Sequence, residues 1–243
     1  MLQGIYESSA IQNYPIGMRY AIDERVFRYG QIYGVDALGG RAVANLATAE
    51  EAAVAAAGSL VGATTVTITV QAAAGLAQNE LRGGYLCYKN VRYYRHRIRS
   101  HPAAGSGATC VLTLETALVG HAVTNGVTVL CAYHSPWARV GFGATYGSGV
   151  SFVGWPFGDI AVGQYTWLQT WGPANGAPAV FFGDVPNERA VWFASDGSLT
   201  TFHAGDSPCS YQYAGFWMPC NWYGGALNAM SDGGHLVFLQ IAP

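Results

Sequence analysis

The sequence predicts an all-β protein, a β-sandwich or β-barrel with Gly-rich turns. From residue 64 onward, short stretches of alternating side chains recur about every ten to twenty residues, separated by Gly, Asn and Asp. The clearest strand is residues 164–171, whose side chains alternate between two faces. Gly163 precedes it, and the Gly172-Pro173 pair after it predicts a turn, because proline cannot continue a central ladder.

The first part of the chain predicts an arm and a hairpin. Residues 1–15 are polar and aromatic without periodicity, which predicts an extended N-terminal arm. Residues 16–22 and 26–33 flank a turn-like Asp-Glu pair and predict two antiparallel strands. The arm and the hairpin therefore precede the main β region of the chain.

An Ala-rich stretch follows, and it predicts one short helix near residues 48–57. Alanine favours helix intrinsically, and the stretch has no Leu or Ile stripe that would extend the helix. Thr48 suits the N-cap and Glu51 the capping-box position. Gly58 is expected to end the helix.

The remaining sequence predicts strands and one domain boundary. Residues 64–72 alternate Val and Ile against Thr and predict a strand. The Asp-Gly pair within residues 195–198 suits a type I′ hairpin turn. A Gly-rich stretch between Trp137 and Phe152 predicts a boundary between an N-terminal β module, residues 16–140, and a C-terminal β-barrel module, residues 152–243.

Composition narrows the possible partners. Only 11% of the 243 residues are charged, which indicates a surface that is covered in an assembly, and a Gly-rich β protein with polar, uncharged loops would have the same composition. The net charge of −2 argues against a nucleic-acid partner. The sequence contains no run of about 18 apolar residues, so a membrane-spanning segment is not predicted. One basic cluster, Arg92, Arg95, Arg97 and Arg99, alternates like a strand and is interpreted as a solvated strand face.

Five widely spaced cysteines and the N-terminus favour folding in a reducing cytoplasm. The cysteines form no CxxC pair, and an odd number in apolar stretches is typical of buried thiols, with a disulfide or a metal site as the alternatives. The N-terminus has no basic segment followed by an apolar one, so a secretory signal is not predicted. The cysteines are Cys87, Cys110, Cys131, Cys209 and Cys220.

No motif in the sequence predicts catalysis. The glycines of GFGATYG, from residue 141, have the wrong spacing for a nucleotide fingerprint and no βαβ unit around them. Ser195, His203 and Asp206 have the residue types of a hydrolytic triad, but the serine lies in a turn without a nucleophile elbow. The spacing of a possible zinc set, His203, Cys209, Cys220 and His235, matches no compact ligand pattern. We therefore predict no enzyme activity, no cofactor and no metal.

Aromatic residues near loops leave three interpretations open. They can fill the core of a Gly-rich β protein, anchor a protein interface, or stack on sugars. The residues concerned are Trp155, Trp171, Trp217, Trp222 and Tyr223.

Several stretches resemble the capsid decoration, or cement, proteins of tailed bacteriophages, which are head-stabilising virion proteins. The stretches are IGMRYAIDERVFRYGQ, GGYLCYKN, YRHRIRSHPAAGSGATCVLTLETAL, GDIAVGQYTWLQTWGPA and GGHLVFLQIA, and together they cover most of the chain. The resemblance implies a structural virion protein made in the host cytoplasm and placed on the capsid surface. It implies the major capsid protein and further copies of the chain as partners, often as trimers, and neither catalysis nor a cofactor. The additional upstream β module departs from the smallest decoration proteins.

The arm and hairpin are the predicted contact with neighbouring subunits. Apolar and aromatic arm residues have no pattern for an internal core, so we expect another chain to bury them, with nearby arginines facing its carboxylates. The predicted interface is Ile5, Tyr6, Ile11, Tyr14, Arg19, Arg25, Arg28, Trp155 and Trp222. The alternative functions are a carbohydrate-binding β module of a fibre or adhesin head and, third, a β-sandwich hydrolase.

Overall fold

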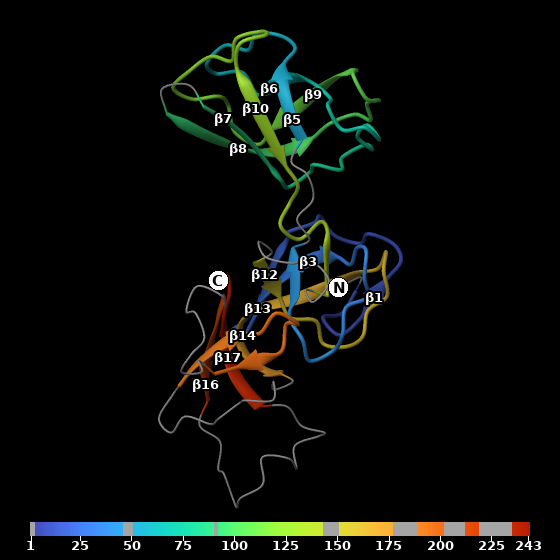
Figure 1. Cartoon of the computed structure of the whole chain (residues 1–243), viewed down its shortest axis with the longest axis vertical. Helices are drawn as coiled ribbons and strands as arrows, with labels where there is room; N and C mark the ends of the chain where they lie inside the picture. Colours follow the sequence, from blue (N-terminus) through green and yellow to red (C-terminus); the bar gives the residue numbers. More distant parts are fainter. Residues whose placement is uncertain are drawn as a thin grey trace, which may run out of the picture. The chain divides into compact units, whose positions relative to one another are not determined.

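The computed structural model describes residues 3–45, 51–89, 92–142, 151–176, 189–201, 212–218 and 235–243, and all of their regular structure is β (Figure 1). This confirms the predicted all-β class. None of these residues belongs to a helix long and apolar enough to cross a membrane. The chain divides into two compact units. We call residues 1–47 with 137–243 the sheet unit, and Thr48–Pro136 the barrel unit.

The sheet unit is organised around one long strand, β13 (Tyr165–Gly176). Its first half pairs with β3 (Arg25–Gln31), and its second half pairs with β17 (His235–Gln240). These segments are far apart in the sequence, so the ladder is built from long-range pairing. The sheet order is β15 (Leu199–Thr200), β14 (Ala190–Phe193), β16 (Gln212–Trp217), β17, β13, β3 and β2 (Arg19–Ile22), with β1 (Ser8–Ser9) also on β13.

Strand β13 does not end at Gly172-Pro173, so the turn predicted there is wrong. At this point β13 leaves β3 through a register shift and continues along β17, where Pro173 faces Phe238. Gly172 has a φ of 89°, and a Cβ there would lie 2.6 Å from the carbonyl oxygen of Glu24. The glycine permits the bend, and the buried Gln169 amide donates to the Pro173 carbonyl at 2.7 Å.

A small three-stranded sheet pairs the strand that precedes the barrel unit in the sequence with the two strands that follow it. Strand β4 (Val43–Asn45) pairs with β11 (Val140–Phe142) and β12 (Ser151–Gly154). Asn45 and Val140 are direct cross-strand partners. The barrel unit is therefore an insertion whose two chain connections leave the sheet unit at neighbouring positions.

The barrel unit is a closed ring of six antiparallel strands around an aliphatic core. Each strand pairs on both edges, which leaves no open sheet edge in the ring. The core is built mainly from Val, Ile and Leu side chains. In ring order the strands are β10 (Val129–Tyr133), β5 (Glu51–Ala55), β6 (Thr65–Thr69), β9 (Thr109–Leu114), β8 (Tyr93–Ser100) and β7 (Tyr85–Lys89).

The predicted helix near residues 48–57 is wrong where the structure describes it. Residues Glu51–Ala55 form β5, which pairs with β10 and β6, and residues 48–50 lie outside the described residues. Closing the ring gives the backbone a hydrogen-bonded partner on both edges. This tertiary pairing outweighs the modest helix preference of alanine.

The two compact units also differ from the predicted modules. The predicted boundary between residues 140 and 152 falls inside the sheet unit, where β11 and β12 both pair with β4. The closed barrel lies within residues 48–136, not residues 152–243. The prediction assigned each module to one continuous stretch of sequence. In the structure, strands within residues 1–47 pair with segments more than ninety residues downstream.

Candidate functional site

The N-terminal segment folds onto the sheet unit and forms one side of the candidate site. Ser8 and Ser9 pair with Thr166 and Tyr165 of β13. Gln3 is only 2% exposed, and its amide nitrogen donates to the carbonyl oxygens of Glu7 at 2.9 Å and Tyr165 at 3.0 Å. The segment is therefore bound to its own unit by backbone and side-chain hydrogen bonds.

An aromatic cluster completes this attachment. Phe27, Tyr29 and Trp167 form its buried centre, and Ile5 and Tyr14 pack against it. The Tyr14 ring lies 5.3 Å from the Tyr29 ring and 5.1 Å from the Trp167 ring. Residues of β3 and β13 therefore already cover Ile5 and Tyr14 in part, which a local pattern does not reveal. Their contact with another chain stays a prediction.

A buried hydroxyl links the cluster to Gln3. The Tyr29 hydroxyl donates to Gln3 Oε1 at 2.6 Å and accepts from the Asn13 backbone N–H at 3.2 Å. Burial raises the pKa of Tyr29 above its ordinary value of 10.0, so the phenol remains a donor. Asn13 Nδ2 also donates to Gln3 Oε1, at 3.0 Å. Gln3 thus accepts two hydrogen bonds at Oε1 and donates two from Nε2.

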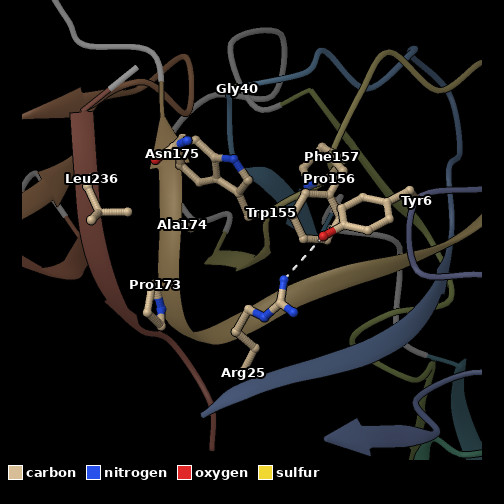
Figure 2. Close-up of a pocket in the computed structure, with 10 residues that line it drawn as sticks. All are labelled: Tyr6, Arg25, Gly40, Trp155, Pro156, Phe157, Pro173, Ala174, Asn175 and Leu236. Carbon is tan, nitrogen blue, oxygen red and sulfur yellow. Dashed lines mark hydrogen bonds between the residues drawn. The ribbon is translucent and has the colours of Figure 1, made fainter. Parts of the chain in front are cut away.

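A cavity of about 400 Å³ lies beside this segment, and it is the candidate binding site (Figure 2). Tyr6 stands at its edge, 68% exposed, with its ring 4.7 Å from that of Phe157 in an edge-on contact. Arg25 donates to the Tyr6 hydroxyl at 3.3 Å across the site, as Figure 2 shows. The lining residues are Tyr6, Arg25, Gly40, Trp155, Pro156, Phe157, Pro173, Ala174, Asn175 and Leu236.

The lining combines aromatic surfaces with few polar groups. The Arg25 guanidinium lies 5.9 Å from the centre of the Phe27 ring and 3.7 Å from the Asp23 carboxylate, which is largely exposed. Asn175 adds an exposed amide on β13. Such a site can hold a small group that has an apolar face and an acceptor oxygen, since rings supply contact area and the guanidinium supplies direction.

The other predicted interface residues are dispersed. Ile11 is 73% exposed and Arg19 is exposed on β2. Arg28 lies 5.0 Å over the Trp137 ring and donates to the carbonyl oxygens of Gly17 and Pro243. Arg28 is thus engaged within its own unit.

Of the three interpretations of the loop aromatics, filling the core applies to Trp155, which conflicts with its place in the predicted interface. Its side chain is 2% exposed and packs 6.0 Å from Phe193 in the core of the sheet unit, with only part of it lining the cavity. Trp171 and Trp217 are partly buried. Trp222 and Tyr223 lie outside the described residues. Local sequence could not reveal the cavity, because its lining comes from six separate stretches of the chain.

The candidate triad and zinc set fall mainly outside the described residues, which cover neither His203, Asp206, Cys209 and Cys220 nor the side chain of His235. Asp196 occupies a turn, but the type I′ geometry predicted for the Asp-Gly pair is wrong, because Gly197 has a φ of 78° and Asp196 has no positive φ. The Asp196 carboxylate accepts from the Ser198 backbone N–H at 3.0 Å. Burial alone would raise the pKa of Asp196, but hydrogen bonds from Ser198 and the charge of Arg41 lower it below its ordinary value. Within the described part of the chain, no three His, Cys, Asp or Glu side chains gather closely enough to hold a metal.

Two buried histidines lie in the barrel unit. His101 Nε2 accepts from the Leu81 backbone N–H at 2.9 Å, and Nδ1 lies 2.8 Å from the Pro102 carbonyl, which places the proton on Nδ1. His96 stacks on Tyr88 at 6.0 Å. Burial lowers the pKa of both imidazoles below their ordinary value of 6.5, so both are neutral packing groups.

Comparison of the chain with protein-family models, with curated proteins and with solved structures finds no match.

Proposed function

We propose that this chain is a structural virion protein that binds and stabilises a capsid lattice, as decoration proteins of tailed bacteriophages do. Three of the stretches that resemble that family map to adjacent strands of one sheet. They form the β2–β3 hairpin, β13 and β17, and pair in the order β2, β3, β13, β17. The stretches that carry the resemblance thus include the centre of the sheet unit.

The exposed apolar surface is the observation that carries this proposal. Nineteen large apolar side chains of the described residues are exposed, in a chain with 11% charged residues. They occur on both units, with Leu60 at 79% and Ile11 at 73% among the most exposed. Partners commonly cover such surfaces in assemblies. The major capsid protein and further copies of this chain are the partners that the proposal names.

Binding to shells tests the proposal. Capsid shells of the parent virus, isolated without this protein, are mixed with the purified chain and sedimented. We expect the chain to sediment with the shells, and Ile11→Asp or Leu60→Asp to weaken binding at least about tenfold. Glu24→Gln, an exposed change that creates no buried charge, is the control. Failure of the wild-type chain to bind shells at any salt concentration contradicts the proposal.

The cavity supports a second candidate function, recognition of carbohydrate. Tyr6 and Phe157 offer ring surface, and Arg25 and Asn175 offer directed polar groups, a common combination at small-molecule sites. A glycan array probed with the wild-type chain tests it. Specific retention lost in Arg25→Ala and kept in Arg19→Ala supports this function, and the absence of any retained glycan contradicts it.

A further inference from the structure

The outer surface of the barrel unit carries an ordered set of arginine, lysine and tyrosine side chains. Burial alternates along β7, β8 and β10, so one set of side chains fills the core and the other points outward. Cross-strand pairing aligns Tyr133 with Tyr85 and Tyr85 with Arg97. The next rows align Cys87 with Arg95, and Lys89 with Tyr93. We define the basic face as Tyr85, Lys89, Tyr93, Arg95, Arg97, Arg99 and Tyr133, on three neighbouring strands (Figure 1).

Most of the charge on this face is not neutralised by the described residues. Arg97 lies 3.6 Å from Glu115, with both side chains about two-fifths exposed. Arg95 and Arg99 are exposed and make no ion pair with any residue that the structure describes. The Lys89 ammonium lies 5.3 Å from the Tyr93 ring, which is itself 79% exposed. The face therefore presents cations held among exposed aromatic rings.

The two units have opposite net charge. The barrel unit contains six Arg or Lys and four Asp or Glu residues, for a net charge of +2. The sheet unit contains six Arg and ten Asp or Glu residues, for a net charge of −4, and four of these acidic residues, Asp184, Glu188, Asp206 and Asp232, lie outside the described residues. The negative charge that complements the basic face is thus present in the sheet unit, and a second copy of the chain brings it within reach.

We propose that the basic face of one copy binds a carboxylate-bearing surface on the sheet unit of a second copy. Arginine and tyrosine are the residue types that dominate binding energy at protein interfaces, and a guanidinium pairs with a carboxylate through two parallel hydrogen bonds. A net charge of +2 is small for a surface that tracks a phosphate backbone, so a protein partner is favoured over nucleic acid. The proposed function already names further copies of the chain as partners, and this inference adds which surfaces meet. Self-association without capsid shells tests it separately from shell binding.

The contact is heterologous, since different surfaces of the two copies meet. Such contacts repeat from copy to copy and produce either closed rings or open chains. Charge complementarity also makes the association faster at low salt and weaker at high salt. Salt-sensitive growth beyond a dimer is therefore the expected behaviour in solution.

Lys89 makes the contact measurable, because it is the only lysine in the chain and lies on the basic face. A carbodiimide joins its amine to a touching carboxylate as an amide, while the reagent takes up the water and becomes a urea. The experiment uses an equal mixture of unlabelled and heavy-nitrogen-labelled protein at low salt. We expect Lys89 peptides joined to sheet-unit carboxylates, with mixed labels that prove a contact between copies. Cross-links only within one label, or none, overturn the proposal.

A matched pair of variants tests the face itself. Arg95→Glu reverses a charge on the basic face, whereas Arg82→Glu makes the same change at an exposed site of the barrel unit outside it. We expect Arg95→Glu to weaken self-association, measured by sedimentation velocity, at least about tenfold, and Arg82→Glu to leave it within about twofold. Equal effects of the two variants, or a wild-type chain that is monomeric at low salt, overturn the proposal. Binding of a single-stranded oligonucleotide by the face in place of self-association also overturns it.

Discussion

The barrel unit and the sheet unit obtain their stability in different ways. The barrel unit is one continuous segment whose six strands each pair on both edges. The sheet unit combines two separate segments, and its sheet ends at β2 and β15. A closed ring satisfies its own edges, whereas an open sheet depends on the segments that cover and extend it. The N-terminal segment is one of the segments on which the sheet unit depends, since β1 pairs with β13.

The cores of the two units also differ, since one is mainly aliphatic and the other contains an aromatic cluster with a buried hydroxyl. Aliphatic side chains dominate the core of the barrel unit, and the buried polar groups beside it include His96 and His101. The aromatic cluster of the sheet unit buries Phe27, Tyr29 and Trp167, and the Tyr29 hydroxyl needs Gln3 and Asn13 as partners. An aromatic core of this kind is sensitive to loss of a polar contact as well as to loss of volume.

Deleting residues 1–15 has the largest expected effect. We expect the free energy of unfolding of the sheet unit to fall by at least about 4 kcal/mol, because the deletion removes the buried Gln3 contacts and the packed Tyr14 ring. Hydrogen-exchange mass spectrometry resolves the two units by peptide. Protection should fall in β3 and β13 and remain in β6 and β9. Unchanged protection in β13 would show that the segment does not belong to the core.

Gly84→Ala should destabilise the barrel unit instead of the sheet unit. A Cβ at residue 84 would lie 2.0 Å from the Tyr133 carbonyl oxygen, so the backbones of β7 and β10 must separate. We expect a loss of about 3 kcal/mol, seen as lower exchange protection in β7 and β10 only. Gly105→Ala is the control, because nothing lies within 4 Å of a Cβ there. Loss of protection in the sheet unit as well would mean that the units unfold together.

Gln3→Ala isolates the polar part of the attachment. We expect a loss of about 2 kcal/mol in the sheet unit, measured by urea unfolding, since the buried Tyr29 hydroxyl loses its acceptor. Gln12→Ala removes an exposed amide that bonds to the Tyr14 carbonyl and should cost about 0.5 kcal/mol or less. Equal costs for the two variants would contradict the buried network.

Mild acid should destabilise the barrel unit, and this is the smallest of the expected effects. The pKa values of His96 and His101 are lowered by burial, with the effect at His101 partly offset by Pro102 and Glu80, so the unfolded chain binds protons first as the pH falls below 6.5. We expect exchange protection of the barrel unit to decline between about pH 7 and about pH 5. His96→Phe, which retains the stack on Tyr88, should reduce this decline. A pH-independent barrel unit would contradict the neutral, buried imidazoles.

Local sequence was sufficient where a strand shows its own pattern. The alternation of β8 places Arg95, Arg97 and Arg99 outward with His96 and Ile98 inward, as the basic cluster predicted. The first half of β13 and the β2–β3 hairpin were also predicted, because a side-chain period of two needs no knowledge of the partner strand. All-β class follows from many such patterns together.

Tertiary structure alone decided the features that depend on pairing between distant residues. The Ala-rich segment became β5 because β6 and β10 offered both edges, and β13 continued past Pro173 because β17 lay beside it. The partners of Ile5, Tyr14 and Trp155 come from other segments of the chain. Alternation tells which face of a strand is apolar, but only the long-range contacts of the folded chain determine what covers that face.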